Sequence, residues 1–332
     1  MILIKGINLN LFSGNTNVTT DSGLSDEMKT YYSDYLIDLA EPLLVHDQFG
    51  QKHPIPKNGG KTIEFRKYSP LPKALTALTE GVTPDGQKLT MSVITATVAQ
   101  YGGYIELSDI LLLTAIDNNL VQATKLLGSQ AGRTLDTITR EVLCGGTNVI
   151  YAGGGSSRAT LVGGANSGNN YLTVDDIKKA VRQLKKMNAP KINGDYVAII
   201  NQDVSYDLTN DPEWKYPHQY VDTENIYSGE IGRIAGCRFV ETSEAKIFAG
   251  AGASSRDVYV TLVMGADAYG VTEVAGGGLQ HIVKQLGSAG TGDPLDQRAT
   301  AGWKATKVAE RLVEEYLVRI ESTSTFNDGT AN

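Results

Sequence analysis

Apolar and polar residues alternate in two separate runs within the first third of the chain. Residues 62–66 alternate with period two, as do residues 89–93, and the second pattern continues to Ile105. Alternation of this kind is typical of β-strands that bury one face. The segment between the two runs is rich in proline and glycine, which predicts an irregular tip. We therefore expect residues 57–106 to form one long β-ribbon.

A ribbon of this length is not expected to be stable by itself. Two-stranded sheets are marginal in water, and their unpaired edges favour pairing with further strands. Either the ribbon folds back on its own body, or it lies on a neighbouring copy of the chain. We favour the neighbouring copy, which makes four apolar residues of the two strands candidate contacts between subunits. They are Ile63, Phe65, Met91 and Val93.

Three segments carry apolar residues at intervals of three and four, which is typical of amphipathic helices. The first covers residues 25–49 and follows a polar start interrupted by glycines. The second covers residues 119–143 and ends at a pair of glycines. The third begins at Thr173, which is expected to cap the helix together with Asp176, and it ends before Pro190. The apolar positions of the second helix are Ala123, Leu127, Ala131, Leu135, Ile138 and Val142.

The remaining apolar runs predict strands. Residues 196–200 form an uninterrupted run, as in a strand buried on both faces, and residues 258–264 form another strand. Residues 303–321 alternate and are expected to end the fold as strands. A segment rich in glycine, serine and asparagine at 152–170 has no periodicity and is predicted to be a loop. Together these elements predict an α+β fold.

The composition is that of a folded chain with a core of its own. Of the 332 residues, 41% are hydrophobic and 20% are charged, which excludes an intrinsically disordered chain. The net charge of −7 argues against a protein whose main role is to neutralise nucleic-acid phosphates. Cys144 and Cys237 form no CxxC pair and indicate no redox role. No apolar run is long enough for a membrane span or a signal peptide, so we expect a cytoplasm-like compartment and no membrane.

Motifs for catalysis or cofactor binding begin in several places but are incomplete. Gly60-Lys61-Thr62 ends like a phosphate-binding loop, but Ile55 occupies the position where that motif requires glycine. The four histidines are scattered singly, without the close spacing of a metal site. A basic helix face over residues 178–186 could grip a phosphate backbone, although a solvated face is the simpler interpretation. We expect no enzyme activity, no cofactor and no metal ion.

Three segments together carry a specific resemblance. They are residues 101–109 (YGGYIELSD), 229–242 (GEIGRIAGCRFVET) and 292–304 (GDPLDQRATAGWK). In this order and spacing they resemble the major capsid protein family typified by the N4-like tailed bacteriophages. The resemblance extends from about Leu24 to Glu321, and no single segment carries it alone.

The resemblance implies the shell fold of tailed phages, also called the Johnson fold. This fold has an N-terminal arm, an extended β-hairpin loop, a peripheral domain with a long spine helix, and an axial domain. The matching segments here are the arm at 1–56, the extended loop at 57–106, the peripheral domain at 107–172 and 285–332 with its spine helix at about 119–143, and the axial domain at 173–284.

The resemblance also implies a structural role rather than an enzymatic one. Copies of the chain would form hexamers and pentamers of an icosahedral shell that encloses double-stranded DNA without sequence-specific binding. Further expected partners are scaffolding, portal and decoration proteins. The chain would be assembled in the host cytoplasm and reside in the virion capsid. A cellular compartment of the same fold, similar to an encapsulin, and a glycine-loop α/β enzyme are the alternatives.

Five residues of the resembling segments are further candidate contacts between subunits. The glycines permit tight turns or close backbone approach where copies meet around an axis. Arg298 and Trp303 follow a rigid Asp293-Pro294 turn, and this cluster would contact a neighbour or fix the hinge between domains. For Trp303, an ordinary place in the core is the alternative. The five residues are Gly229, Gly232, Gly236, Arg298 and Trp303.

Overall fold

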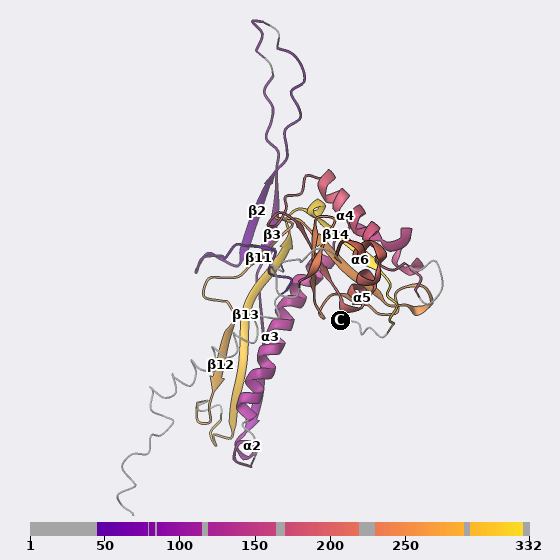
Figure 1. Ribbon diagram of the computed structural model, residues 1–332. Helices are drawn as coiled ribbons and strands as arrows, with labels where there is room; N and C mark the ends of the chain where they lie inside the picture. The colour runs from indigo at the N-terminus through magenta and orange to yellow at the C-terminus, as the bar shows by residue number, and fades with distance from the viewer. Residues whose placement is uncertain are drawn as a thin grey trace, which may run out of the picture.

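The computed structural model describes residues 45–78, 80–83, 85–114, 119–163, 170–218, 230–288 and 293–327. Most of the helix predicted at 25–49 lies outside these residues, and so does Gly229. The described part is elongated (Figure 1). A lobe of helices and sheet lies to one side of a long stem, and a two-stranded hairpin projects from the stem beyond the lobe.

The lobe is built on a seven-stranded sheet. Its path is β5 (Val149–Tyr151), β14 (Leu317–Ser322), β10 (Val258–Met264), β6 (Tyr196–Ile200), β8 (Cys237–Glu241) and β7 (Glu230–Ile234), with β9 (Ile247–Phe248) paired to β10. Every residue of β6 and β10 is buried, as the uninterrupted apolar runs predict. Because side chains alternate along β6, Ala198 and Ile200 pack in one core cluster, while Val197 and Ile199 pack in another.

Helices cover the first of these clusters. They are α4 (Val174–Lys186), α5 (Gln202–Asn210) and α6 (Pro212–His218). Helix α4 begins as predicted, because the Thr173 hydroxyl accepts a hydrogen bond of 3.4 Å from the backbone N–H of Asp176. The lobe also contains the short 3-10 helices η3 (Ala152–Gly154), η4 (Arg158–Thr160), η5 (Ala253–Ser255) and η7 (Glu314–Tyr316). Two of these lie in the segment at 152–170 that was predicted to be a loop.

The stem consists of a long helix on a long strand (Figure 1). Helix α3 (Asn119–Cys144) follows the predicted spine helix closely. At 1.5 Å per residue it is about 39 Å long. Leu127, Ala131 and Leu135 of its predicted apolar face pack with Ala301 and Trp303. The helix ends in the lobe, where Leu143 joins the second core cluster.

The strands of the stem form a five-stranded sheet around one central strand. They are β1 (Gln51–Lys52), β11 (Tyr269–Thr272), β13 (Arg298–Arg311), β12 (Gln280–Lys284) and β4 (Ala99–Ser108), which is followed by the short helix α2 (Asp109–Thr114). Strand β4 pairs antiparallel along its whole length with residues 298–307 of β13, from Ala99↔Lys307 to Ser108↔Arg298. The strands predicted at 303–321 are confirmed, although they begin earlier and are interrupted by η7.

The predicted ribbon at 57–106 is therefore only half right. Strands β2 (Thr62–Tyr68) and β3 (Met91–Thr97) do pair with each other and form the projecting hairpin. Beyond Val98 the returning chain leaves this partner and joins β13 of the body. Ten residues of β13 pair with β4, so the backbone groups of β4 find partners in the sheet of the body. A free two-stranded ribbon would be less stable than this sheet. Strand β4 thus folds back onto the body, whereas the hairpin of β2 and β3 projects from it.

Candidate subunit-contact surfaces

The projecting hairpin has one face that packs on its own body. Residues directly opposite each other in an antiparallel pair lie on the same face, and here Phe65 is opposite Ile94. The Phe65 ring meets His53 edge-on with a centroid distance of 5.7 Å. The ring also lies close to Gly270, since a Cβ atom added to that glycine would be 3.2 Å from Cζ of Phe65. Ile63 lies on the same face opposite the buried Ala96. Ile63 and Phe65 thus anchor the base of the hairpin to its own chain.

The other face of the hairpin is exposed, polar toward its base and mostly apolar toward the tip. It carries Met91 opposite Tyr68, and Val93 opposite Arg66. Met91 and Val93 are each 44% exposed, and Tyr68 is more exposed than either. The four candidate residues of the ribbon therefore separate into an anchoring pair, Ile63 and Phe65, and an outward pair, Met91 and Val93. Of the two pairs, the outward pair leaves the larger share of its side-chain surface open to a neighbouring molecule.

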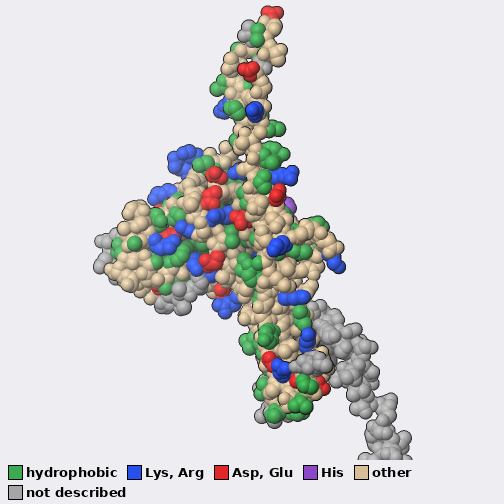
Figure 2. Space-filling view, turned by 180° about the vertical axis from the view of Figure 1, so that it is seen from behind, with side chains coloured by type: hydrophobic (Ala, Val, Ile, Leu, Met, Phe, Trp, Pro, Cys, Tyr) green, Lys and Arg blue, Asp and Glu red, His purple; other side chains and the backbone are tan. Residues whose placement is uncertain are grey.

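The irregular tip of the hairpin extends this apolar surface. Large apolar side chains there are between 50% and 86% exposed. They are Leu71, Leu75, Leu78, Val82 and Leu89. Figure 2 shows hydrophobic side chains along the projection, far from the rest of the body. Large apolar patches that stay exposed in an isolated chain mark contact surfaces.

A second exposed apolar surface lies at the opposite end of the stem (Figure 2). We call it the far-end surface. It consists of Ile110 and Leu113 of α2 together with Leu295, all of them exposed, whereas the exposed Tyr104 of β4 and Leu126 of α3 lie elsewhere on the stem. The run of apolar residues in α2 was its one sequence signal, but a short apolar run predicts a buried segment as readily as an exposed one. Sequence reasoning therefore missed this surface.

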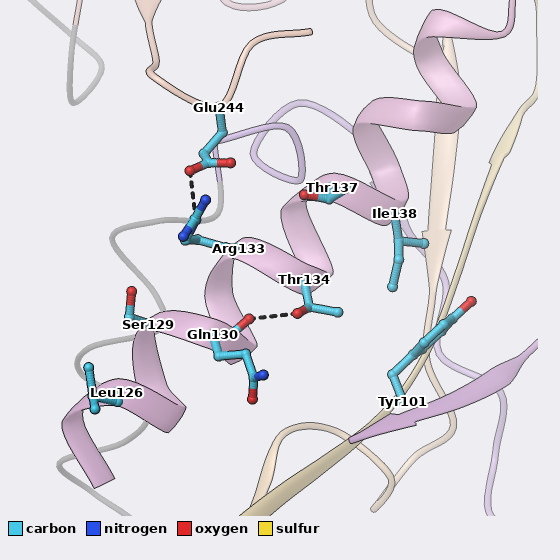
Figure 3. Close-up of a pocket in the computed structure, with 9 residues that line it drawn as sticks. All are labelled: Tyr101, Leu126, Ser129, Gln130, Arg133, Thr134, Thr137, Ile138 and Glu244. Atoms are coloured by element: carbon cyan, nitrogen blue, oxygen red, sulfur yellow. Dashed lines mark hydrogen bonds and ion pairs between the residues drawn. The ribbon is translucent and has the colours of Figure 1, made fainter. Parts of the chain in front are cut away.

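Between the stem and the lobe, helix α3 borders an open groove of about 520 Å³ (Figure 3). Its lining residues are Tyr101, Leu126, Ser129, Gln130, Arg133, Thr134, Thr137, Ile138 and Glu244. One ion pair crosses it, because Nε of Arg133 lies 2.8 Å from Oε1 of Glu244. The Thr134 hydroxyl donates to the backbone oxygen of Gln130 within the helix. The described lining contains one carboxylate, that of Glu244, and no cysteine or histidine.

Two of the three resembling segments lie side by side in the stem. Residues 101–109 form most of β4, residues 292–304 lead into β13, and Gly103 is directly opposite Trp303. The glycines allow close approach. A Cβ atom on Gly102 would lie 2.6 Å from the backbone oxygen of Trp303. Sequence-distant motifs thus meet in one ladder, with α3 above it.

Trp303 lies in the core of its own chain, which was the alternative to a contact with a neighbour. It is 4% exposed and packs with Leu127, Ala131 and Leu135 of α3. Its indole side chain is therefore enclosed by its own chain and cannot serve as an anchor on a neighbour. Arg298, by contrast, is exposed at the end of the stem, 3.4 Å from Glu106 and 3.9 Å from Asp293. Its place beside the far-end surface keeps it a candidate for contact between subunits.

The third resembling segment forms the hairpin β7–β8. Ala235 and Gly236 make its two-residue turn, with φ values of 54° and 80°. Positive φ at both positions is the geometry of tight hairpin turns, and it explains the glycine. Gly232 lies beside an irregularity in the pairing of β7 with β8. The local backbone geometry thus explains why glycine stands at positions 232 and 236. A role of either glycine in contacts between subunits stays a prediction.

A buried polar cluster that sequence reasoning missed fixes the start of the described chain to the stem. Asp136 of α3 accepts a 2.8 Å hydrogen bond from the backbone N–H of His46 and lies 2.6 Å from Nδ1 of the same residue. The next residue, Asp47, accepts from Thr139 at 2.5 Å and pairs with Lys307. Burial lowers the pKa of Lys307, although the charge of Asp47 opposes this. We call these five residues the root cluster.

Within the described residues, no group of three or more histidine, cysteine, aspartate or glutamate side chains could hold a metal ion. None of the described helices is both long and apolar enough to cross a membrane.

Comparison with known proteins gives consistent results. A model of the phage capsid protein family matches residues 92–316. The capsid of Ralstonia phage GP4 is 15% identical, with a TM-score of 0.66 over 86% of this chain and 90% of that chain. The Cyanophage Pam1 capsid is also 15% identical, with a TM-score of 0.61 over 84% of this chain and 89% of that chain. No curated protein matches the sequence.

These matches confirm the predicted α+β fold of a tailed-phage shell protein. The solved structures come from diverse phages, including one that infects Helicobacter pylori, which is 11% identical with a TM-score of 0.55. Similarity this low shows a shared fold. It does not single out the N4-like phages, so that part of the resemblance stays a prediction, as do the domain boundaries.

Proposed function

Because this chain belongs to the phage capsid protein family and is a shell-forming capsid protein, we propose that its copies form hexamers and pentamers that close into an icosahedral shell around double-stranded DNA. The observation that carries this proposal is the projecting hairpin. Exposed apolar side chains line its tip and the adjoining part of its outward face, and the described body of the chain leaves much of their surface uncovered. A neighbouring copy would cover them.

The two apolar surfaces lie at opposite ends of the molecule, which favours a closed assembly of many copies. The hairpin forms one end, and the far-end surface with Arg298 forms the other. A contact between two different patches is heterologous, so it generates rings or extended lattices rather than isolated dimers. Each contact is modest, but a subunit held at several places is held tightly.

The polar interior of the fold supports a rigid building block. The root cluster ties residues 46 and 47 to α3 and β13, which fixes the start of the described chain to the stem. We assign residues 1–56 to an N-terminal arm, 57–106 to the extended loop, 107–172 and 285–332 to a peripheral domain, and 173–284 to an axial domain. The arm would tie down an adjacent subunit.

The net charge of −7 suits a container that does not hold its genome tightly. DNA would be enclosed without sequence-specific contacts. Assembly in the host cytoplasm would use a scaffolding protein, and the mature capsid would also contain a portal and, in some shells, decoration proteins. A cellular compartment of the same fold is not favoured, because the matching family is that of phage capsids.

Electron microscopy and light scattering of the purified full chain, alone and with its scaffolding protein, test the proposal. We expect closed particles with hexameric and pentameric units. The double variant Met91→Ser/Val93→Ser should reduce particle formation at least tenfold, because each apolar side chain loses about 1 kcal/mol of burial in every contact. Its melting temperature before assembly should fall only slightly, since each side chain is already 44% exposed in the unassembled chain.

Thr95→Ser is the matched control, because Thr95 follows Met91 and Val93 on the same outward face and is already polar. It should assemble like the unmodified chain. A compact monomer under every assembly condition, with and without scaffold, would contradict the proposed function.

A further inference from the structure

The tip of the hairpin has a helical sequence pattern but no helix. Leu71, Leu75, Leu78 and Val82 are spaced by four, three and four residues. On a helix over residues 72–80, Leu75 and Leu78 would fall within about 60° of arc, and Leu71 and Val82 would flank its two ends. On a strand they would be divided, with Leu71 and Leu75 on one face and Leu78 and Val82 on the other. In the structure all four are exposed and belong to neither a helix nor a strand.

Signals for both ends of a helix flank this pattern. Pro72 is suited to the first helical position, where its missing N–H is not needed. Gly81 has a φ of 77°, the left-handed conformation that commonly follows the last turn of a helix. In such a helix end, the residue after the glycine packs against the last turn. Here that residue is Val82, and its partner in the last turn would be Ala77. The backbone of Gly81 thus already has the conformation that ends a helix.

The tip lacks a surface on which to fold. Residues 72–80 would make about two and a half turns, and isolated helices this short are unstable in water. Helices of this length form when their apolar face packs on something else. Every described residue of the tip is exposed, so the described part of the body offers no such surface.

We propose that residues 72–80 fold into an amphipathic helix when the tip docks on a second copy of this chain. The inference rests on the proposed function, because in a shell made of one chain a second copy is the partner that each hairpin meets. The tip charges also favour a protein surface over DNA or an anionic membrane. Lys73 and Lys88 balance Glu80 and Asp85, so the tip carries no net charge.

Hydrogen exchange of the full chain before and after assembly tests this directly. A helix bonds each backbone N–H to the carbonyl four residues earlier, so a continuous run of amides from Leu75 onward should become protected in particles. A strand added to a sheet edge would protect alternate amides instead. Alternate protection, or no protection in well-formed particles, would overturn the inference while leaving the proposed function intact.

Two substitutions outside the apolar stripe give a second test. Ala77→Gly should raise the critical concentration for assembly about fivefold, because glycine disfavours a helix relative to alanine. Thr76→Ala should lower it about twofold for the same reason. If the tip docked as a strand, Thr76→Ala would weaken assembly, because threonine is favoured in strands. That result would contradict the proposal.

Both variants should melt like the unmodified chain before assembly, since both positions are exposed. Failure of the unmodified chain to form particles under any condition would instead refute the proposed function. The two failures are therefore distinguishable.

Discussion

Nε1 of Trp303 donates a 3.0 Å hydrogen bond to Oε1 of Gln130, joining strand β13 to helix α3. The indole ring is buried, whereas the Gln130 side chain lines the open groove (Figure 3). This bond satisfies the one polar atom of the largest side chain in the stem core. It also explains why a tryptophan, rather than a phenylalanine, stands between the helix and the sheet.

Gln130→Leu should destabilise the chain by about 1–3 kcal/mol, because it leaves the buried indole N–H without its acceptor. Urea unfolding of the unassembled chain measures the effect. Gln122→Leu is the matched control, since Gln122 is an exposed residue of the same helix. It should change the free energy of unfolding by less than about 0.5 kcal/mol. Equal stability of the two variants would contradict the structural role of the bond.

Gly102→Ala should destabilise the chain by about 1–3 kcal/mol, because the new methyl group forces β4 away from β13. A Cβ atom there would lie 2.6 Å from the backbone oxygen of Trp303. Thermal unfolding measures the loss. At Gly86, in the exposed tip, a Cβ atom would meet nothing within 4 Å. Gly86→Ala should therefore leave the melting temperature unchanged, and a similar loss in both variants would argue against close packing at Gly102.

Cys144 should be unreactive in the folded chain. Burial raises the pKa of its thiol to about 12, and the charge of Glu141 adds to this effect. Burial also raises the pKa of Cys237. At pH 8 the thiolate form of Cys144 is about one part in ten thousand, so a thiol reagent has almost nothing to attack. We expect no labelling by Ellman's reagent in buffer and labelling of both thiols in denaturant. Rapid labelling of the folded chain would show that these thiols are accessible.

Glu141 should contribute to stability in a pH-dependent way. Burial alone would raise its pKa, but hydrogen bonds from Lys246 and Arg140, each 2.9 Å long, outweigh burial and lower it below 4.5. Because the folded pKa is lower than the unfolded one, the contribution is complete above about pH 4.5 and is lost as the pH falls further. The carboxylate is half exposed, so screening by water limits the contribution to at most about 1 kcal/mol.

Glu141→Gln should accordingly be less stable than the unmodified chain at pH 7, and the difference should vanish toward pH 3. Urea unfolding at several pH values measures this. Glu80→Gln, in the exposed tip, should follow the unmodified chain at each pH. A difference for Glu141→Gln that grows as the pH falls would have the wrong sign for this ion pair.

The candidate contact residues show how far local patterns reach. Alternation placed Ile63 with Phe65 and Met91 with Val93, but it could not say which pair faces the body. The register of β2 with β3 decides this, because a shift by one residue would exchange the faces. The far-end surface was missed for a related reason, since a short apolar run in α2 has the same pattern whether it is buried or exposed.

The sequence by itself determined the elements whose causes are local. The spine helix, the cap at Thr173 and the buried strand at 196–200 follow from periodicity and capping within a few residues, and the structure confirms them. Only the tertiary structure decided that β4 pairs with β13, that Trp303 is enclosed by α3, and that Asp136 holds His46. These partners are separated by 90 or more positions in the chain. Pairing over such distances depends on which surfaces the whole fold brings together, and no local pattern records it.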